Sequence, residues 1–109
     1  MTSDPAPLFH LTSSREWKAA SAAGAVVPAG FAEEGFVHCS TAGQIEGVFE
    51  RYYADLADPV LLRVDPGALG ALEVRWEGEP ERFPHVYGPL PVAAVTAAAD
   101  PWRPRDPLP

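Results

Sequence analysis

The stretch GFVHCSTAGQIEGVFERYY, residues 35–53, decides the fold, because it holds the clearest strand and the clearest helix of the chain. Successive side chains of a strand point to opposite faces of a sheet. A strand over residues 36–40 therefore places Phe36, His38 and Ser40 on one face and the two residues between them on the other. The first face carries two polar side chains, and the second is apolar.

The helix of this stretch is predicted to begin at Thr41, because Gln44 stands three residues later and completes a capping box. Asp58-Pro59 ends it. Between these points apolar residues recur at the i, i+3, i+4 and i+7 spacing of an amphipathic helix, namely at Ile45, Val48, Phe49 and Tyr52.

Outside this stretch, residues 8–11 form a short predicted strand, and a second capping box at Ser13 and Glu16 starts a helix that Gly24 ends. Three further strands are predicted over residues 60–65, 72–77 and 92–98. Strands outnumber helices and do not alternate with them, which indicates a mixed α+β domain rather than repeated βαβ units.

The length of 109 residues allows one domain, which we place at residues 8–99 between a disordered lead at 1–7 and a proline-rich tail at 100–109. Fifteen acidic residues against eight basic ones give a net charge of -7. A field of that sign repels nucleic acid and anionic membranes, so we expect neither as a partner. The solitary Cys39 suits a reducing compartment, and we therefore expect a cytoplasmic protein. The oligomeric state stays open.

The predicted core consists of the apolar positions whose spacing selects one face of each element. These positions are Phe9, Leu11, Trp17, Val37, Cys39, Ile45, Val48, Phe49, Leu61, Val64 and Trp76.

His38 and Ser40 lie on one strand face, directly ahead of the helix predicted to begin at Thr41. The first turn of a helix presents free N–H groups and a partial positive charge, which suits a phosphate or a carboxylate. One interpretation is therefore a pocket that binds a phosphate-bearing small molecule. The other is a half-buried histidine bonded to a neighbouring strand, with Ser40 or Thr41 only capping the helix.

Two further histidines have two interpretations each. His10 ends the first strand and either lines the same cleft or lies on the surface. His85 and Tyr87 belong to the rigid, proline-bracketed segment 83–90, which positions either a function or a corner of the fold. We predict that the three histidines and Ser40 converge on one concave pocket. Glu77, after Trp76 at a strand end, is the acidic residue to which we assign a catalytic role.

No metal and no standard nucleotide-binding loop is indicated. The chain has no CxxC, no HExxH and no histidine pair at i, i+4 spacing, and it lacks the P-loop, GxGxxG and GxSxG patterns. A site of three histidines assembled in space is the alternative left open.

Two segments, GFVHCST at residues 35–41 and FPHVYGPL at residues 83–90, form a pair of long motifs at a specific separation. Together with Gln44, His10-Leu11-Thr12, Trp17, Val64-Asp65 and Trp76-Glu77, they make the chain resemble the bacterial domain of unknown function 952 family. The resemblance runs from about Leu8 to Ala98.

The resemblance implies a fold similar to that of the ADP-ribosyltransferase superfamily, with two main helices and a split, mostly antiparallel sheet around an NAD-binding cleft. The layout also resembles a shortened RNA 2'-phosphotransferase domain. By position, His10 and Thr12 would correspond to the histidine and threonine at the nicotinamide–ribose end of NAD. His38 and Ser40 would line the cleft, and Glu77 would be the late acidic residue of these transferases.

From this resemblance we expect NAD as cofactor and ADP-ribosyl or related transfer as the reaction. The catalytic residues would be His10, His38 and Glu77, and the ligand-binding residues Thr12, Ser40, Thr41, His85 and Tyr87. Leu11 stands where the related transferases have glycine, and its side chain crowds the approach of a dinucleotide. The alternative is a non-enzymatic module that binds a small molecule or nucleotide. Glu77 discriminates the two, because an enzyme needs it in the pocket.

Overall fold

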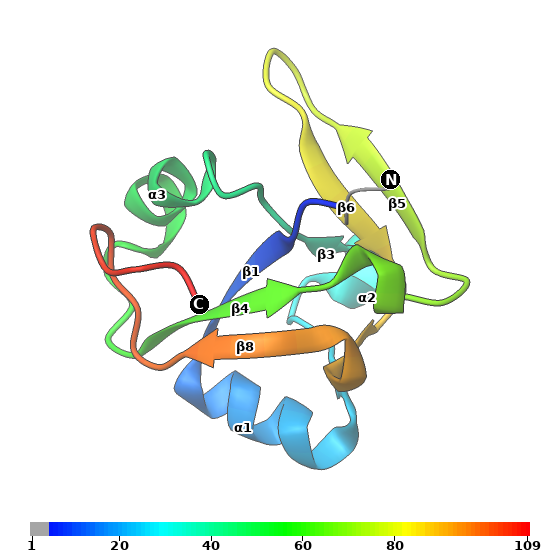
Figure 1. The fold of residues 1–109 in the computed structure, drawn as a ribbon, viewed down its shortest axis with the longest axis horizontal. Coiled ribbons are helices and arrows are strands. Elements are labelled where there is room, and N and C mark those ends of the chain that lie inside the picture. Colours follow the sequence, from blue (N-terminus) through cyan, green and yellow to red (C-terminus); the bar gives the residue numbers. More distant parts are fainter. Residues whose placement is uncertain (1–4) are drawn as a thin grey trace.

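The computed structural model describes residues 5–109, so the first four residues of the lead expected at 1–7 lie outside it. The strands and helices are β1 (Leu8–Ser13), α1 (Ser14–Ala23), β2 (Ala25–Val26), α2 (Phe31–Glu34), β3 (Val37–His38), α3 (Ile45–Val48), β4 (Pro59–Val64), β5 (Glu73–Glu77), β6 (Phe83–Tyr87), β7 (Leu90–Pro91) and β8 (Val95–Ala99). A π-helical turn, Phe49–Tyr53, continues α3, and 3₁₀ turns occupy Pro66–Ala68 and Val92–Ala94. These elements form one α+β domain (Figure 1). None of the helices within residues 5–109 has the length and apolar character that a membrane crossing requires.

All the strand pairs are antiparallel. In one sheet β4 lies between β1 and β8, in a second β6 lies between β3 and β5, and β2 pairs with β7. Phe9 of β1 and Ser40, which follows β3, exchange backbone N–H···O bonds of 2.8 Å and so join the first two sheets. The prediction of a mostly antiparallel α+β domain is confirmed.

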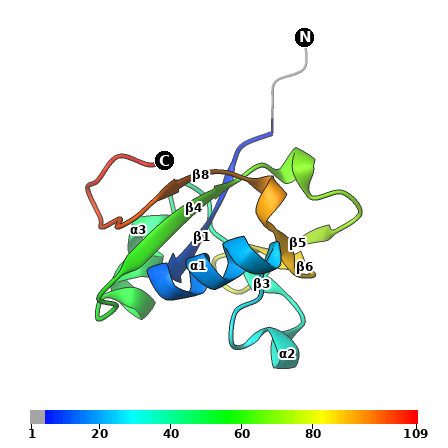
Figure 2. The ribbon, with the colours of Figure 1, turned by 90° about the horizontal axis from the view of Figure 1, so that it is seen from below.

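Helix α1 forms as its sequence predicts. Ser13 Oγ accepts a hydrogen bond of 3.1 Å from the backbone N–H of Glu16, and Gly24 ends the helix in a left-handed conformation with φ 93°. Glycine adopts that conformation without the steric cost that a Cβ atom brings. The helix lies in front of β1 and β4 in Figure 2, and its residues Trp17 and Ala20 pack into the apolar core.

Helix α3 begins later and buries a different tyrosine than the sequence predicts. Residues 42–44 form a turn, in which Gln44 Oε1 accepts a hydrogen bond of 3.0 Å from the N–H of Thr41. The π-helical turn that follows closes i→i+5 hydrogen bonds and therefore takes more residues per turn than an α-helix. As a result Tyr53 packs against the core, whereas Tyr52 is 73% exposed, so the assignment of Tyr52 to the buried face is wrong.

The core consists of two apolar clusters on the two faces of the β1–β4–β8 sheet. The predicted core residues are confirmed as buried for Phe9, Leu11, Val37, Cys39, Ile45, Phe49, Leu61 and Val64, and as partly buried for Trp17 and Val48.

Two tryptophans lie where the sequence does not predict them. Trp76 is 48% exposed, because the end of the β5–β6 hairpin projects beyond the rest of the domain (Figure 1), and its assignment to the core is wrong. Trp102 belongs to the proline-rich segment 100–109 and is almost completely buried. Its ring meets the ring of Phe49 edge to face, with 6.0 Å between the centroids.

Candidate functional site

A pocket with a volume of about 660 Å³ lies between the β3–β6–β5 sheet, the π-helical turn after α3 and the tip of the β5–β6 hairpin. Such a volume is in the range of small-molecule sites. Its lining includes His38, Ser40, Tyr53, Glu77, Phe83 and His85.

Strand pairing places the functional side chains of this sheet on one face. His38 of β3 and Arg75 of β5 both pair with His85 of β6, so the three side chains form a row across the sheet. The alternate residues Val37 and Val86 pair with each other and are fully buried on the opposite face. The period of two in the sequence therefore separates a core face from a polar face.

Glu77 is the centre of a hydrogen-bond cluster in the pocket. Its Oε1 accepts a hydrogen bond from the hydroxyl of Tyr87 and a second one from Nδ1 of His85 at 3.0 Å. These two bonds, the first being the larger cause, lower the pKa of Glu77 below its ordinary value of 4.5. The same contact with the carboxylate raises the pKa of Tyr87. Glu77 is therefore ionised at neutral pH, and it faces the pocket.

Aromatic rings stack beside this cluster. The ring of Phe36 lies parallel to the imidazole of His85, with 4.0 Å between centroids and 10° between planes. His38 meets Phe36 and His85 edge to face at 4.8 and 5.0 Å. Arg75 lies over the ring of Tyr87 at 4.2 Å. These contacts fix the orientation of both pocket histidines.

A second carboxylate holds His38. Glu34, the last residue of α2, lies 2.9 Å from Nε2 of His38 through its Oε2. Neither the contact of Glu34 with His38 nor the stacking of Phe36 on His85 is predicted from the sequence. The four-residue spacing of Glu34 and His38 was an available signal, but Gly35 interrupts the helix there, so the spacing indicated no pairing.

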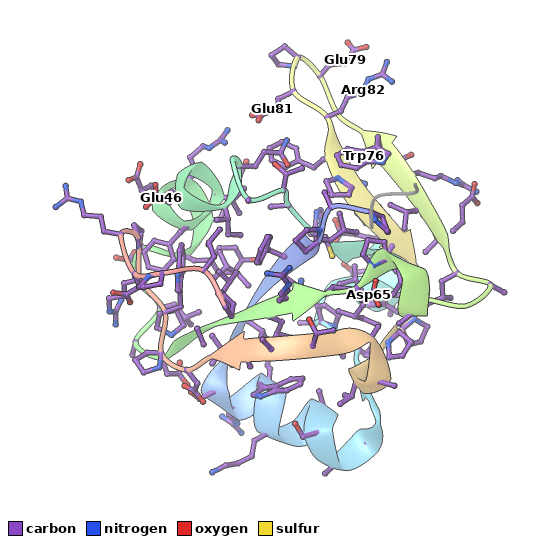
Figure 3. All side chains as sticks on the ribbon, in the orientation of Figure 1. Glu46, Asp65, Trp76, Glu79, Glu81 and Arg82 are labelled. Carbon is purple, nitrogen blue, oxygen red and sulfur yellow. The ribbon has the colours of Figure 1, made fainter. Side chains whose placement is uncertain are left out.

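The tip of the β5–β6 hairpin forms one wall of the pocket and is attached to the region around α3. Gln44 Nε2 donates to the carbonyl oxygen of Arg82 at 2.7 Å and to Oε2 of Glu81 at 3.2 Å. Arg51 lies 3.9 Å from the other carboxylate oxygen of Glu81. In Figure 3 the side chain of Glu81 points toward α3, whereas those of Glu79 and Arg82 point away from it.

Comparison with known proteins gives the family. The model of the family described as "Protein of unknown function (DUF952)" matches residues 11–98, which is most of the chain. The chain belongs to the DUF952 family. This confirms the resemblance seen in the sequence.

Solved structures of one other protein support the same placement. The X-ray crystal structure of CC0527 from Caulobacter crescentus is 34% identical, with a TM-score of 0.77 over 86% of this chain and 84% of that chain. The solution NMR structure of CC0527 is 35% identical, with a TM-score of 0.73 over 86% and 83% of the two chains. No curated protein matches the chain.

In this DUF952 domain, His10 does not line the pocket. It is buried, and its Nδ1 donates a hydrogen bond of 2.6 Å to the backbone carbonyl oxygen of His38. Burial is the largest influence on this imidazole and lowers its pKa below 6.5. Thr12 is also buried and donates to Glu16 Oε2 at 2.8 Å. Four of the predicted site residues line the pocket, namely His38, Ser40, Glu77 and His85. Tyr87 is connected to the pocket by its hydrogen bond to Glu77. The other three, His10, Thr12 and Thr41, lie outside the lining.

Within residues 5–109 of this DUF952 domain, no group of three or more His, Cys, Asp or Glu side chains is placed so that it could hold a metal ion. Cys39 borders the pocket, but it is 2% exposed, and burial raises the pKa of its thiol to about 12. The thiol is therefore protonated and a poor nucleophile.

Proposed function

We propose that this protein binds the nicotinamide–ribose end of NAD beside Glu77 and transfers the ADP-ribosyl group to an acceptor. The observation that carries the proposal is the ionised carboxylate of Glu77, which His85 and Tyr87 hold in a pocket that His38 also lines. The antiparallel α+β domain, with its sheet divided near β3, is compatible with the ADP-ribosyltransferase-like fold that the sequence resembles.

The chemistry assigned to Glu77 is electrostatic. When the glycosidic C–N bond of NAD breaks, its electron pair leaves with neutral nicotinamide, and positive charge develops on the ribose carbon and ring oxygen. A carboxylate held close to that carbon stabilises this charge, as in other glycosyl transfers. The acceptor oxygen then forms the new bond to the ribose carbon and loses its proton, for which His38 is the more exposed of the two imidazoles that line the pocket.

His10 takes a different part from the one expected. Its imidazole is bonded to the carbonyl oxygen of His38, so it acts as a positioning residue for His38 rather than as a group that contacts the ligand. This observation favours the second candidate function, a binding module without catalysis, because His10 and Thr12, the two residues expected at the nicotinamide–ribose end, both lie outside the pocket lining.

Release of nicotinamide from NAD tests the proposal. The Glu77→Gln variant should lose roughly a hundredfold or more of the rate, in line with the loss of one preorganised electrostatic group. Glu73→Gln is the matched control, because Glu73 lies on the same strand and face but pairs with Arg75 outside the pocket lining. An equal effect of both substitutions contradicts the role of Glu77. NAD binding without any nicotinamide release favours the binding module.

A further inference from the structure

The charged side chains that line the pocket are predominantly acidic. Glu77, Glu79 and Glu81 are among the lining residues, and Arg51 is the one arginine or lysine among them in the described chain. The side chain of Glu79 points away from α3 (Figure 3), so the carboxylates of Glu77 and Glu81 are the ones set against the guanidinium of Arg51. Nearby Arg82 does not offset this excess, because its side chain points away from α3 (Figure 3) and it is absent from the lining.

The guanidinium of Arg51 is also engaged by the protein itself. Its Nε donates to the carbonyl oxygen of Gly47 at 3.2 Å, its Nη2 lies 3.9 Å from Glu81 Oε1, and its centre lies 5.9 Å from the ring centroid of Tyr52. A phosphate group that bound to Arg51 would have to approach Glu81 as well. Like charges brought close together in a partly enclosed site repel each other strongly.

The uncharged part of the lining favours a flat ring. Tyr52, Tyr53 and Phe83 border the pocket, and His85 borders it with Phe36 stacked on its imidazole. The faces of tyrosine and phenylalanine rings attract cations through their negative π-surface. A planar cation therefore gains from the rings and from the carboxylates together.

Ser40 gives a second, independent indication of a ligand. It is 4% exposed and lines the pocket, and its hydroxyl takes part in none of the side-chain hydrogen bonds formed within residues 5–109. Within residues 5–109 no fully buried side-chain oxygen or nitrogen lacks a hydrogen-bond partner. The hydroxyl of Ser40 is therefore reached from the pocket and offers a ligand one polar contact there.

We infer that the pocket selects a planar aromatic cation that carries no phosphate, such as a pyridinium N-riboside, over its phosphorylated forms. The inference rests on the nicotinamide–ribose site of the proposed function but not on its ADP-ribosyl step, because a pocket that disfavours phosphate binds NAD more weakly than the riboside. It differs from the expectation of a phosphate-bearing ligand, one support of which was a helix start at Thr41 that the structure places at Ile45.

The test compares the affinities of three nicotinamide compounds and one uncharged analogue. Nicotinamide riboside carries the cationic ring without phosphate, nicotinamide mononucleotide adds one phosphate, NAD adds the remaining nucleotide, and benzamide riboside replaces the cation by a neutral ring. Calorimetric titrations at about pH 8 keep ordinary histidines neutral. We expect nicotinamide riboside to bind roughly tenfold more tightly than the mononucleotide and more tightly than benzamide riboside. Added salt should weaken binding of the riboside, because it screens the attraction.

Variants test whether acidic side chains of the hairpin tip cause the selection against phosphate. Replacing Glu79 and Glu81 by glutamine should bring the affinities of the riboside and the mononucleotide together. Glu50→Gln is the control. It removes one acidic side chain of the π-helical turn that carries Arg51, outside the pocket lining, and should leave the ratio of the two affinities unchanged. Circular dichroism and the melting temperature establish that each variant is folded, and the salt dependence of the wild type tests the inference even if the double variant does not fold.

The outcomes separate this inference from the proposed function. Equal or tighter binding of the mononucleotide or of NAD overturns the selection against phosphate, while the proposed nicotinamide site stands. If the folded double variant still binds the riboside more tightly than the mononucleotide, the inference is also overturned, because Glu79 and Glu81 would not be the cause of the selectivity. If none of the three nicotinamide compounds binds, both the inference and the proposed function are wrong.

Discussion

The imidazole of His10 donates a hydrogen bond of 2.6 Å to the backbone carbonyl oxygen of His38. The two histidines to which the sequence assigns catalysis are thus connected through the protein backbone and not across a ligand. His10 belongs to the β1–β4–β8 sheet and His38 to the β3–β6–β5 sheet, so this bond joins the two sheets close to the pocket.

Acid should weaken the fold through His10. Burial holds the folded-state pKa of His10 below its ordinary value of 6.5, against smaller opposing effects of the hydrogen bond to the His38 carbonyl oxygen and of Glu16. The stabilisation is therefore fully present above pH 6.5 and is lost as the pH falls from 6.5 toward the folded-state pKa. Urea unfolding between about pH 8 and pH 5 should show a steeper decline in the wild type than in His10→Gln. Parallel pH profiles would contradict the buried neutral state of this imidazole.

Trp76 and Trp102, whose positions the sequence does not predict, should differ strongly in their contribution to the free energy of unfolding. Trp102→Ala removes a side chain that is 1% exposed and packs on Phe49, and it should cost about 3–5 kcal/mol. Trp76→Ala is the matched control at an exposed position and should cost less than about 1 kcal/mol. Urea denaturation of the two variants measures both values. A smaller loss for Trp102→Ala than for Trp76→Ala would show that segment 100–109 is not docked as described.

These tryptophans show what the local sequence pattern can and cannot predict. The alternation over residues 72–77 correctly predicted strand β5, but a period of two does not reveal how far a hairpin extends beyond the layer that covers it. Trp102 was missed because prolines on either side of it indicate an irregular segment, and irregular segments can still place one ring in a core. The helix from Ile45 was predicted, whereas its π-helical turn, which buries Tyr53 in place of Tyr52, has no signature in the spacing of apolar residues.

The sequence predicts which strand residues line the candidate site, but it does not predict which of its side chains contact each other. The alternation at His38 and Ser40 placed both on the pocket side. The contact of Glu77 with His85 depends on the register between β5 and β6, and the contact of Glu34 with His38 depends on how α2 returns to β3. Neither relationship is encoded in the spacing within a single segment.

Gln44 should hold the hairpin tip in place. Gln44→Ala removes the hydrogen bonds to Glu81 and to the carbonyl oxygen of Arg82, so the amides of Glu79, Glu81 and Arg82 should exchange with deuterium faster than in the wild type. Amides of β4, which lies in the core, serve as the internal control. Equal exchange at the tip in both proteins would show that Gln44 does not fix this wall of the pocket.

Cys39 should be unreactive in the folded protein. Burial raises the pKa of its thiol to about 12, so the thiolate is scarce at pH 8 and reagent access is blocked. A thiol reagent such as 5,5'-dithiobis(2-nitrobenzoic acid) should label it only after unfolding in guanidinium. Rapid stoichiometric labelling of the native protein would contradict the placement of Cys39 in the core.

The central claim is that the pocket beside Glu77 receives a nicotinamide-bearing ligand. The most direct measurement is an NMR titration of the ¹⁵N-labelled protein with NAD at millimolar concentration. We predict shift changes at Cys39, Ser40 and Gly78, which line the pocket, and their loss in a folded His38→Ala variant, whose parent side chain is 54% exposed. Unchanged spectra, or changes confined to the separate cavity of about 370 Å³ near Arg63 and Thr96, would contradict the claim.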